Sequence, residues 1–149
     1  MTDAAIAEIA AYATLAVNAV GAAYGGLRWW QAAPSDAVWP LLRCGQLVAG
    51  VQALVAGLLF VAGYRPDDGL YWLYALLPVA IGFVAEQLRV ASAEQVLDNR
   101  DLPDTQAVGE LPADQQRSVV LAVLRREMGV MALAALVVAF LALRAALIA

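Results

Sequence analysis

The chain of 149 residues is 63% hydrophobic and 15% charged, with a formal net charge of −4. Arginine is its only cation, since lysine and histidine are both absent; this excludes imidazole haem ligation, the usual zinc sites and a histidine general base. We therefore expect no cofactor and no metal; the alternative is a metal bound by carboxylates alone. We expect no nucleic-acid partner, because no basic stripe lies outside the apolar segments.

The first predicted element is a membrane span over about residues 5–30. Asp3 and Glu8 stand where a cleaved secretory signal would be positive, so we expect this span to be retained. Residues 9–27 carry no formal charge. Arg28 and Trp29 then mark a membrane interface, where cations and aromatic rings settle.

The second predicted span covers about residues 40–63, after a short link with turn residues. Apart from Arg43 near its start it holds no charge for about twenty residues, the length that a helix needs to cross the hydrocarbon layer of roughly 30 Å. The lone cysteine, Cys44, cannot form an intrachain disulfide, and we expect it to serve in packing.

Small or polar residues recur at steps of four, three and four on one face of each of these helices. The residues are Thr14, Asn18, Gly21 and Gly25 on the first, and Gly45, Ala49, Gln52 and Ala56 on the second. Helices in lipid associate through such faces and through a few polar contacts. We therefore predict that the two helices pack together. We also predict that the intramembrane amides of Asn18 and Gln52 meet, because Asn18 lies ten residues before Arg28 and Gln52 lies nine residues after Arg43, at a matching depth. The alternative is that alanine and glycine are simply common in membrane helices.

The third predicted span covers about residues 70–97 and continues past the membrane. Tyr71 and Trp72 mark the opposite interface, and Pro78 predicts a kink. The acidic, turn-rich segment 98–112 follows, and we expect it to be an irregular loop whose acids do not fit a calcium-binding EF-hand.

The last predicted helix covers about residues 113–148. At 1.5 Å per residue it reaches roughly 50 Å, longer than the hydrocarbon layer. Its first three turns must therefore lie outside the membrane, beside the protruding end of the third helix.

These elements predict one all-α integral membrane domain over residues 1–149, a four-helix antiparallel bundle, because short links force antiparallel neighbours. Arginines are unevenly divided between its two sides. Arg65 and Arg144 lie on the side of the termini, and Arg28, Arg43, Arg89, Arg100, Arg117, Arg125 and Arg126 lie on the other. By the positive-inside rule we expect a multi-pass protein of the cell membrane, with both termini outside and the loop 98–112 cytoplasmic.

A sequence match between the two halves predicts an internal repeat. VGAAYGGLR (20–28) aligns with IGFVAEQLR (81–89), and LRCGQLVAGVQALV (42–55) aligns with LRREMGVMALAALV (124–137). The match predicts two tandem helical hairpins related by a pseudo-twofold axis along the membrane normal. Chance similarity between alanine-rich spans is the alternative.

The two halves differ by two carboxylates, since Glu86 aligns with Gly25 and Glu127 aligns with Gly45. Ionisable groups at membrane depth are costly, so they should be paired or line a site. We predict a polar cup at the cytoplasmic end, in which each glutamate contacts at least one arginine. Glu86 and Arg89 are three residues apart and can pair on one helix, and Glu127 reaches Arg43, which lies at a matching depth. The members of the cup are Arg28, Arg43, Glu86, Arg89, Arg125 and Glu127. The cup either stabilises the end of the bundle through ion pairs, or it binds an anionic lipid headgroup or passes a solute.

The residue types indicate a non-catalytic membrane protein that acts through helix packing in the lipid bilayer. Small-residue faces and the protruding helices favour assembly into a homo-oligomer or with a membrane partner protein. A small transporter or channel is one alternative, favoured by the repeat, by Pro78 and by the intramembrane amides of Asn18 and Gln52. The other is a protein that binds or modifies an anionic lipid at the cup.

Overall fold

The computed structural model describes residues 2–149, which form helices and no strand. Their order is α1 (Asp3–Trp30), α2 (Val38–Val61), α3 (Leu70–Asp98), α4 (Thr105–Gly109) and α5 (Ala113–Leu147). Four of these helices, α1, α2, α3 and α5, are long and apolar enough to cross a membrane. The fold is therefore all-helical and compatible with a multi-pass membrane protein.

Local side-chain and backbone features set the helix ends. Thr2 caps α1, because its Oγ1 accepts a hydrogen bond from the amide of Ala5 at 3.2 Å. Gly63 follows α2 with φ of 92°, a left-handed conformation that glycine adopts without a Cβ clash. Asp68 precedes α3, and its Oδ1 accepts from the amide of Leu70 at 2.8 Å. The long helices begin and end within two residues of the expected spans.

The sequence predicts an irregular loop over residues 98–112, but this segment contains the short helix α4. Asp104 caps this short helix, and its Oδ1 accepts from the amide of Ala107 at 2.8 Å. The segment is tied to α5 by Gln116, whose Nε2 donates to the carbonyl oxygens of Gly109 at 2.9 Å and Leu111 at 2.7 Å. Capping and these tertiary bonds order a stretch that its composition alone marks as a loop.

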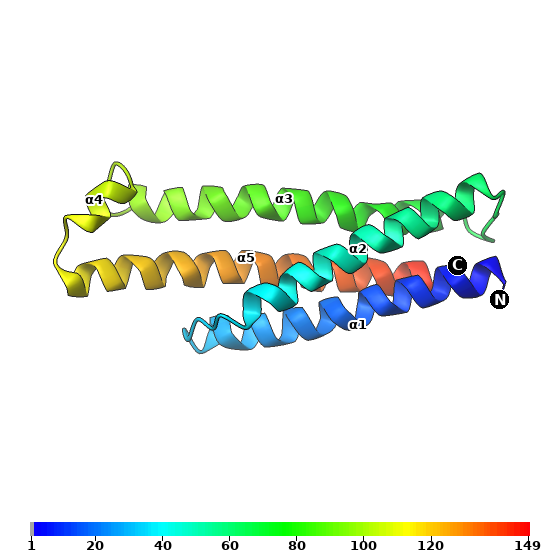
Figure 1. Cartoon of the computed structure of the whole chain (residues 1–149), viewed down its shortest axis with the longest axis horizontal. Helices are drawn as coiled ribbons and strands as arrows, with labels where there is room; N and C mark the ends of the chain where they lie inside the picture. Colours follow the sequence, from blue (N-terminus) through cyan, green and yellow to red (C-terminus); the bar gives the residue numbers. More distant parts are fainter. Residues whose placement is uncertain (1) are drawn as a thin grey trace.

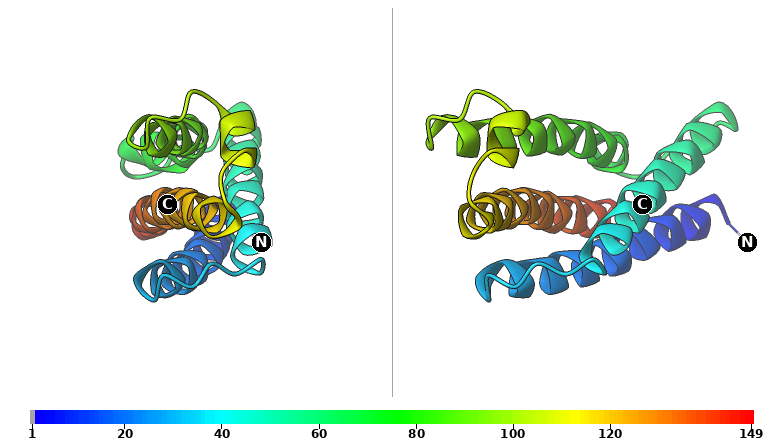
Figure 2. Two further views of the ribbon diagram at one scale, coloured as in Figure 1. Left: turned by 90° about the vertical axis from the view of Figure 1, so that its left-hand side faces the viewer. Right: turned by 60° about the vertical axis from the view of Figure 1, so that its left-hand side comes forward.

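The helix α5 lies between α1 and α3, and α2 crosses obliquely over one face of the layer that these three form (Figures 1 and 2). Successive long helices run in opposite directions along the molecule, and both termini lie at one end (Figure 1). At that end all four helices share a core of small residues around Tyr71 and Leu59. A second core around Met128 and Leu42 lies toward the other end.

The helices α3 and α5 extend well beyond the end of α1 and are joined there by α4 (Figure 1). Arg125 is level with the end of α1, since its Nε donates to the carbonyl oxygen of Trp29 at 3.3 Å. Residues 113–124 of α5 thus project about 18 Å past α1. We call these residues and residues 91–98 of α3 the stem; Val96 and Val119 are buried within it.

Candidate functional site

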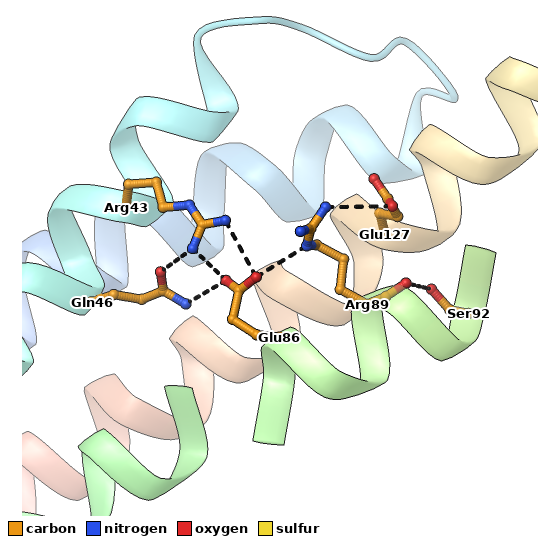
Figure 3. Close-up of polar contacts among 6 residues, drawn as sticks. All are labelled: Arg43, Gln46, Glu86, Arg89, Ser92 and Glu127. Atoms are coloured by element: carbon orange, nitrogen blue, oxygen red, sulfur yellow. Dashed lines mark hydrogen bonds and ion pairs between the residues drawn. The ribbon is translucent and has the colours of Figure 1, made fainter. Parts of the chain in front are cut away.

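A network of charged side chains joins α2 to α3 and α5 (Figure 3). Arg43 of α2 holds Glu86 of α3 through two parallel hydrogen bonds, Nη1 to Oε1 at 2.5 Å and Nη2 to Oε2 at 3.2 Å. Gln46, three residues after Arg43 and so on the same helix face, donates from Nε2 to Glu86 Oε1 at 3.0 Å. Such bidentate, charge-assisted bonds fix the orientation of both groups.

Arg89 links the two glutamates (Figure 3). Its Nε donates to Glu86 Oε2 at 3.1 Å, and its Nη1 donates to Glu127 Oε1 at 3.5 Å. The guanidinium also lies over the ring of Trp39, 5.9 Å from its centroid. The network runs inward from Arg43, whose side chain is 49% exposed, to Glu127, whose side chain is 14% exposed.

This network balances its own charge, since two arginines face two glutamates. Each carboxylate accepts from a guanidinium, so neither is free to act as a base without breaking an ion pair. These bonds join three helices, and each charged group in them has a partner of opposite charge. The ion pairs therefore hold α2, α3 and α5 together.

Arg28 and Arg125 lie outside this network, which corrects the prediction that six residues form one cup. The Arg28 guanidinium lies over the ring of Tyr24 at 5.7 Å, and its Nη1 donates to Gln31 Oε1 at 3.5 Å. Arg125 bonds the carbonyl oxygen of Trp29 and lies over its ring at 5.8 Å. Each of these two arginines thus contacts an aromatic ring of α1 and an oxygen atom of α1 or of the link that follows it.

The predicted pair between Glu127 and Arg43 is also wrong. Arg43 faces α3 and pairs with Glu86, while Arg89 lies between the two glutamates and takes Glu127 (Figure 3). The aligned halves suggested equal depths for Glu127 and Arg43, but depth alone does not decide which helix lies between them.

Asn18 is buried where α1 meets α2, but its partner is not Gln52. Its Nδ2 donates to the carbonyl oxygen of Gly45 at 3.1 Å and to that of Thr14, one turn earlier on its own helix, at 3.0 Å. Gln52 is 1% exposed, and within residues 2–149 neither its Nε2 nor its Oε1 has a hydrogen-bond partner. The predicted contact between the two amides is therefore wrong.

The register of the two helices explains this error. Asn18 lies opposite Gly45, and Thr14 lies opposite Val48, to whose carbonyl oxygen its Oγ1 donates at 3.4 Å. Gln52 lies one further turn along α2 and so about two turns from Asn18. The prediction counted depth from Arg28 and from Arg43 as if the two were level. Arg28 lies two residues before the end of α1, whereas Arg43 lies in the second turn of α2.

An apolar groove with a volume of about 780 Å³ lies between α1 and α5. One side is formed by α1, mostly by small residues, and the other side is formed by α5. Its lining is Ala19, Ala22, Ala23, Gly26, Trp29, Arg126, Gly129, Val130, Ala132, Leu133 and Leu136. The two polar groups of this set, Trp29 and Arg126, lie at one end of the lined stretch of each helix.

The sequence offered signals for the residues that were missed. Gln46 follows Arg43 by three positions, the spacing of neighbours on one helix face. Gly129 follows Arg126 by three, and a Cβ there would lie 2.7 Å from Trp29 Nε1, so the indole packs directly on the α5 backbone. Which α5 residue meets Trp29 depends on helix register, which no residue pattern gave.

No cluster of three or more cysteine, aspartate or glutamate side chains that could hold a metal occurs in the described part of the chain. Cys44 is exposed. The chain matches no protein-family model, no curated protein and no solved structure.

Proposed function

We propose that this chain is a multi-pass membrane protein that acts without catalysing a reaction, by assembling with itself or with a membrane partner protein. Its long helices form a four-helix antiparallel transmembrane bundle, in which α5 is the central member. The ion network supports a non-catalytic role, because Glu86 and Glu127 each accept from an arginine. The stem supplies the surface for assembly.

The distribution of arginines supports an orientation with both termini outside and the stem, α4 and the loop 98–112 in the cytoplasm. The proposed repeat of two hairpins has the support of the sequence match alone. In the fold, α5 is central and α2 crosses one face, so the two second helices of the hairpins occupy unlike positions (Figure 2).

The observation that carries the proposal is apolar surface on the stem. Val120 and Leu121, adjacent on α5, are 48% and 43% exposed. Both lie in the part of α5 that extends past α1, where our orientation places water. Fully burying such a side chain contributes about 1.5 to 3 kcal/mol. A second stem or a partner helix packed over these two residues would gain part of this energy.

Subunit counting by single-molecule photobleaching in liposomes tests the proposal. We expect two or more subunits for the native chain, and a shift to monomers when Val120 and Leu121 are both changed to serine. The matched control changes Leu58 and Val61, exposed on the membrane-spanning α2, to serine and should leave the count unchanged. A monomeric native chain that also yields no photo-cross-link from position 121 in native membranes would contradict assembly.

A small transporter or channel is the second candidate, and one observation favours it. Gln52 is buried without a hydrogen-bond partner in the described chain, as a polar group on a solute path would be. The central cavity near Pro78 holds only about 20 Å³, however, which is room for about one water molecule. Solute flux measured in the same liposomes decides between the two, and sustained flux would replace assembly as the function.

A further inference from the structure

We propose that the groove between α1 and α5 binds one acyl chain of an anionic phospholipid of the cytoplasmic leaflet, with Arg126 contacting the headgroup phosphate. The proposal rests on the orientation given above but not on assembly, since the groove and the stem are different surfaces.

The length of the groove fits a lipid chain of one leaflet. Its lining extends from Trp29 to Ala19 on α1 and from Arg126 to Leu136 on α5. The ten residue steps between the ends of each stretch correspond to about 15 Å, half of the roughly 30 Å hydrocarbon layer. A partner transmembrane helix crosses the whole layer and would need a matching surface along its full length. The groove covers only about half of that length.

The shape of the groove leaves room for an apolar chain. Gly26 lines the α1 side of the groove, and a Cβ placed there would meet nothing within 4 Å. Leu133 and Leu136 form its side on α5 and remain 63% and 57% exposed. An acyl chain in the groove would cover these side chains while touching the small residues of α1.

The charge at the mouth of the groove fits a phosphate. Arg126 donates to the neutral Gln95 Oε1, and Arg125 donates to the carbonyl oxygen of Trp29. Neither arginine pairs with a carboxylate within residues 2–149, unlike the two arginines of the ion network. The indole of Trp29 beside them is a group that settles at headgroup level. The cationic end of the groove therefore selects an anionic headgroup over a zwitterionic one.

Photolabelling in vesicles tests the site. The protein is reconstituted in phosphatidylcholine vesicles that contain phosphatidylglycerol with a photoactivatable group in its acyl chain, and labelled peptides are mapped by mass spectrometry. Arg126→Gln removes the charge, and Gly26→Leu fills the groove. The matched controls are Arg144→Gln at the opposite end of α5 and Gly57→Leu, where a Cβ also meets nothing within 4 Å. Thermal unfolding checks that each variant is folded.

We expect labels concentrated in residues 19–26 and 129–136. An arginine near the membrane surface contributes about 1 kcal/mol of attraction to anionic lipid, so Arg126→Gln should reduce labelling about fivefold. A parallel experiment uses phosphatidylcholine that carries the same photoactivatable group. Gly26→Leu should reduce labelling by both lipid probes, and the two control variants should be labelled as strongly as the native chain. Three results would overturn the proposal: labels spread evenly over the exposed helix faces, equal labelling by both probes in the native chain, or a second copy cross-linked across the groove. Failure of this test while subunit counting still detects oligomers would leave assembly intact.

Discussion

Replacing Gly45 with alanine should destabilise the fold, although a glycine-to-alanine change inside a helix ordinarily stabilises it by about 0.5 to 1 kcal/mol. A Cβ at position 45 would lie 2.6 Å from Oδ1 of Asn18 and 3.1 Å from its Cγ. Asn18 is 3% exposed and is held by two hydrogen bonds, so it has little freedom to move aside.

The expected loss follows from two contributions. Forcing an extra methyl group into a packed contact costs about 1 to 3 kcal/mol. If the helices separate, the bond from Asn18 to the Gly45 carbonyl oxygen is lost as well, and interhelical bonds of this kind are worth about 0.6 kcal/mol. The strain outweighs the gain in helix propensity, and the sign of the change is therefore reversed relative to an open site.

Reversible unfolding in bicelles measures this change. Gly50→Ala is the matched control, because it lies on the same helix and its Cβ would meet nothing within 4 Å. Adding Asn18→Ala to Gly45→Ala removes the clashing amide and should recover stability relative to Gly45→Ala alone, a non-additive effect. Equal stability of Gly45→Ala and Gly50→Ala would refute the close approach of α1 and α2 at this point.

Three further predictions concern the ion network and two tightly packed sites. Glu86→Gln should lower the unfolding temperature more than Arg43→Gln, because Glu86 accepts hydrogen bonds from three side chains. A double-mutant cycle on Glu86 and Arg43 should give a coupling energy of about 0.5 to 1 kcal/mol, since Arg43 is half-exposed. Strict additivity of the two substitutions would contradict the ion pair. Gly129→Ala places a Cβ 2.7 Å from Trp29 Nε1 and should destabilise by about 1 to 3 kcal/mol in thermal unfolding, whereas native stability would show that the indole does not pack there. Gln52→Leu should be neutral or stabilise by about 1 kcal/mol, because it removes two buried polar atoms without partners; a clear loss of stability would mean that the amide is satisfied.

The helices themselves could be predicted from the sequence because their signals are local. Long uncharged stretches, flanking aromatic residues and the turn at Gly63 each depend on a few neighbouring residues. α4 was missed because its stability comes from Asp104 and from bonds to α5, and the second of these is a tertiary contact. A short polar segment carries no apolar period that would reveal such a helix.

The site could be predicted only in part, because charge pairing depends on how the helices are placed. The sequence singled out Arg43, Glu86, Arg89 and Glu127, and the fold brings these four together. The pair of Glu86 with Arg89 could be predicted from their spacing of three on one helix. The pairs between helices, Arg43 with Glu86 and Arg89 with Glu127, could not be predicted, since they depend on helix rotation and register. The groove escaped prediction for the same reason, because its two sides come from helices at opposite ends of the chain.

Cysteine labelling from each side of the membrane tests most directly whether the stem lies in the cytoplasm. Gln106→Cys in α4 and Asp67→Cys in the turn before α3 are each introduced into a chain carrying Cys44→Ser, and a membrane-impermeant maleimide is applied to intact cells and to inverted vesicles. We predict that position 106 is labelled only in inverted vesicles and that position 67 is labelled only in intact cells. Labelling of position 106 from outside intact cells would contradict the orientation, and with it the cytoplasmic stem and the lipid site.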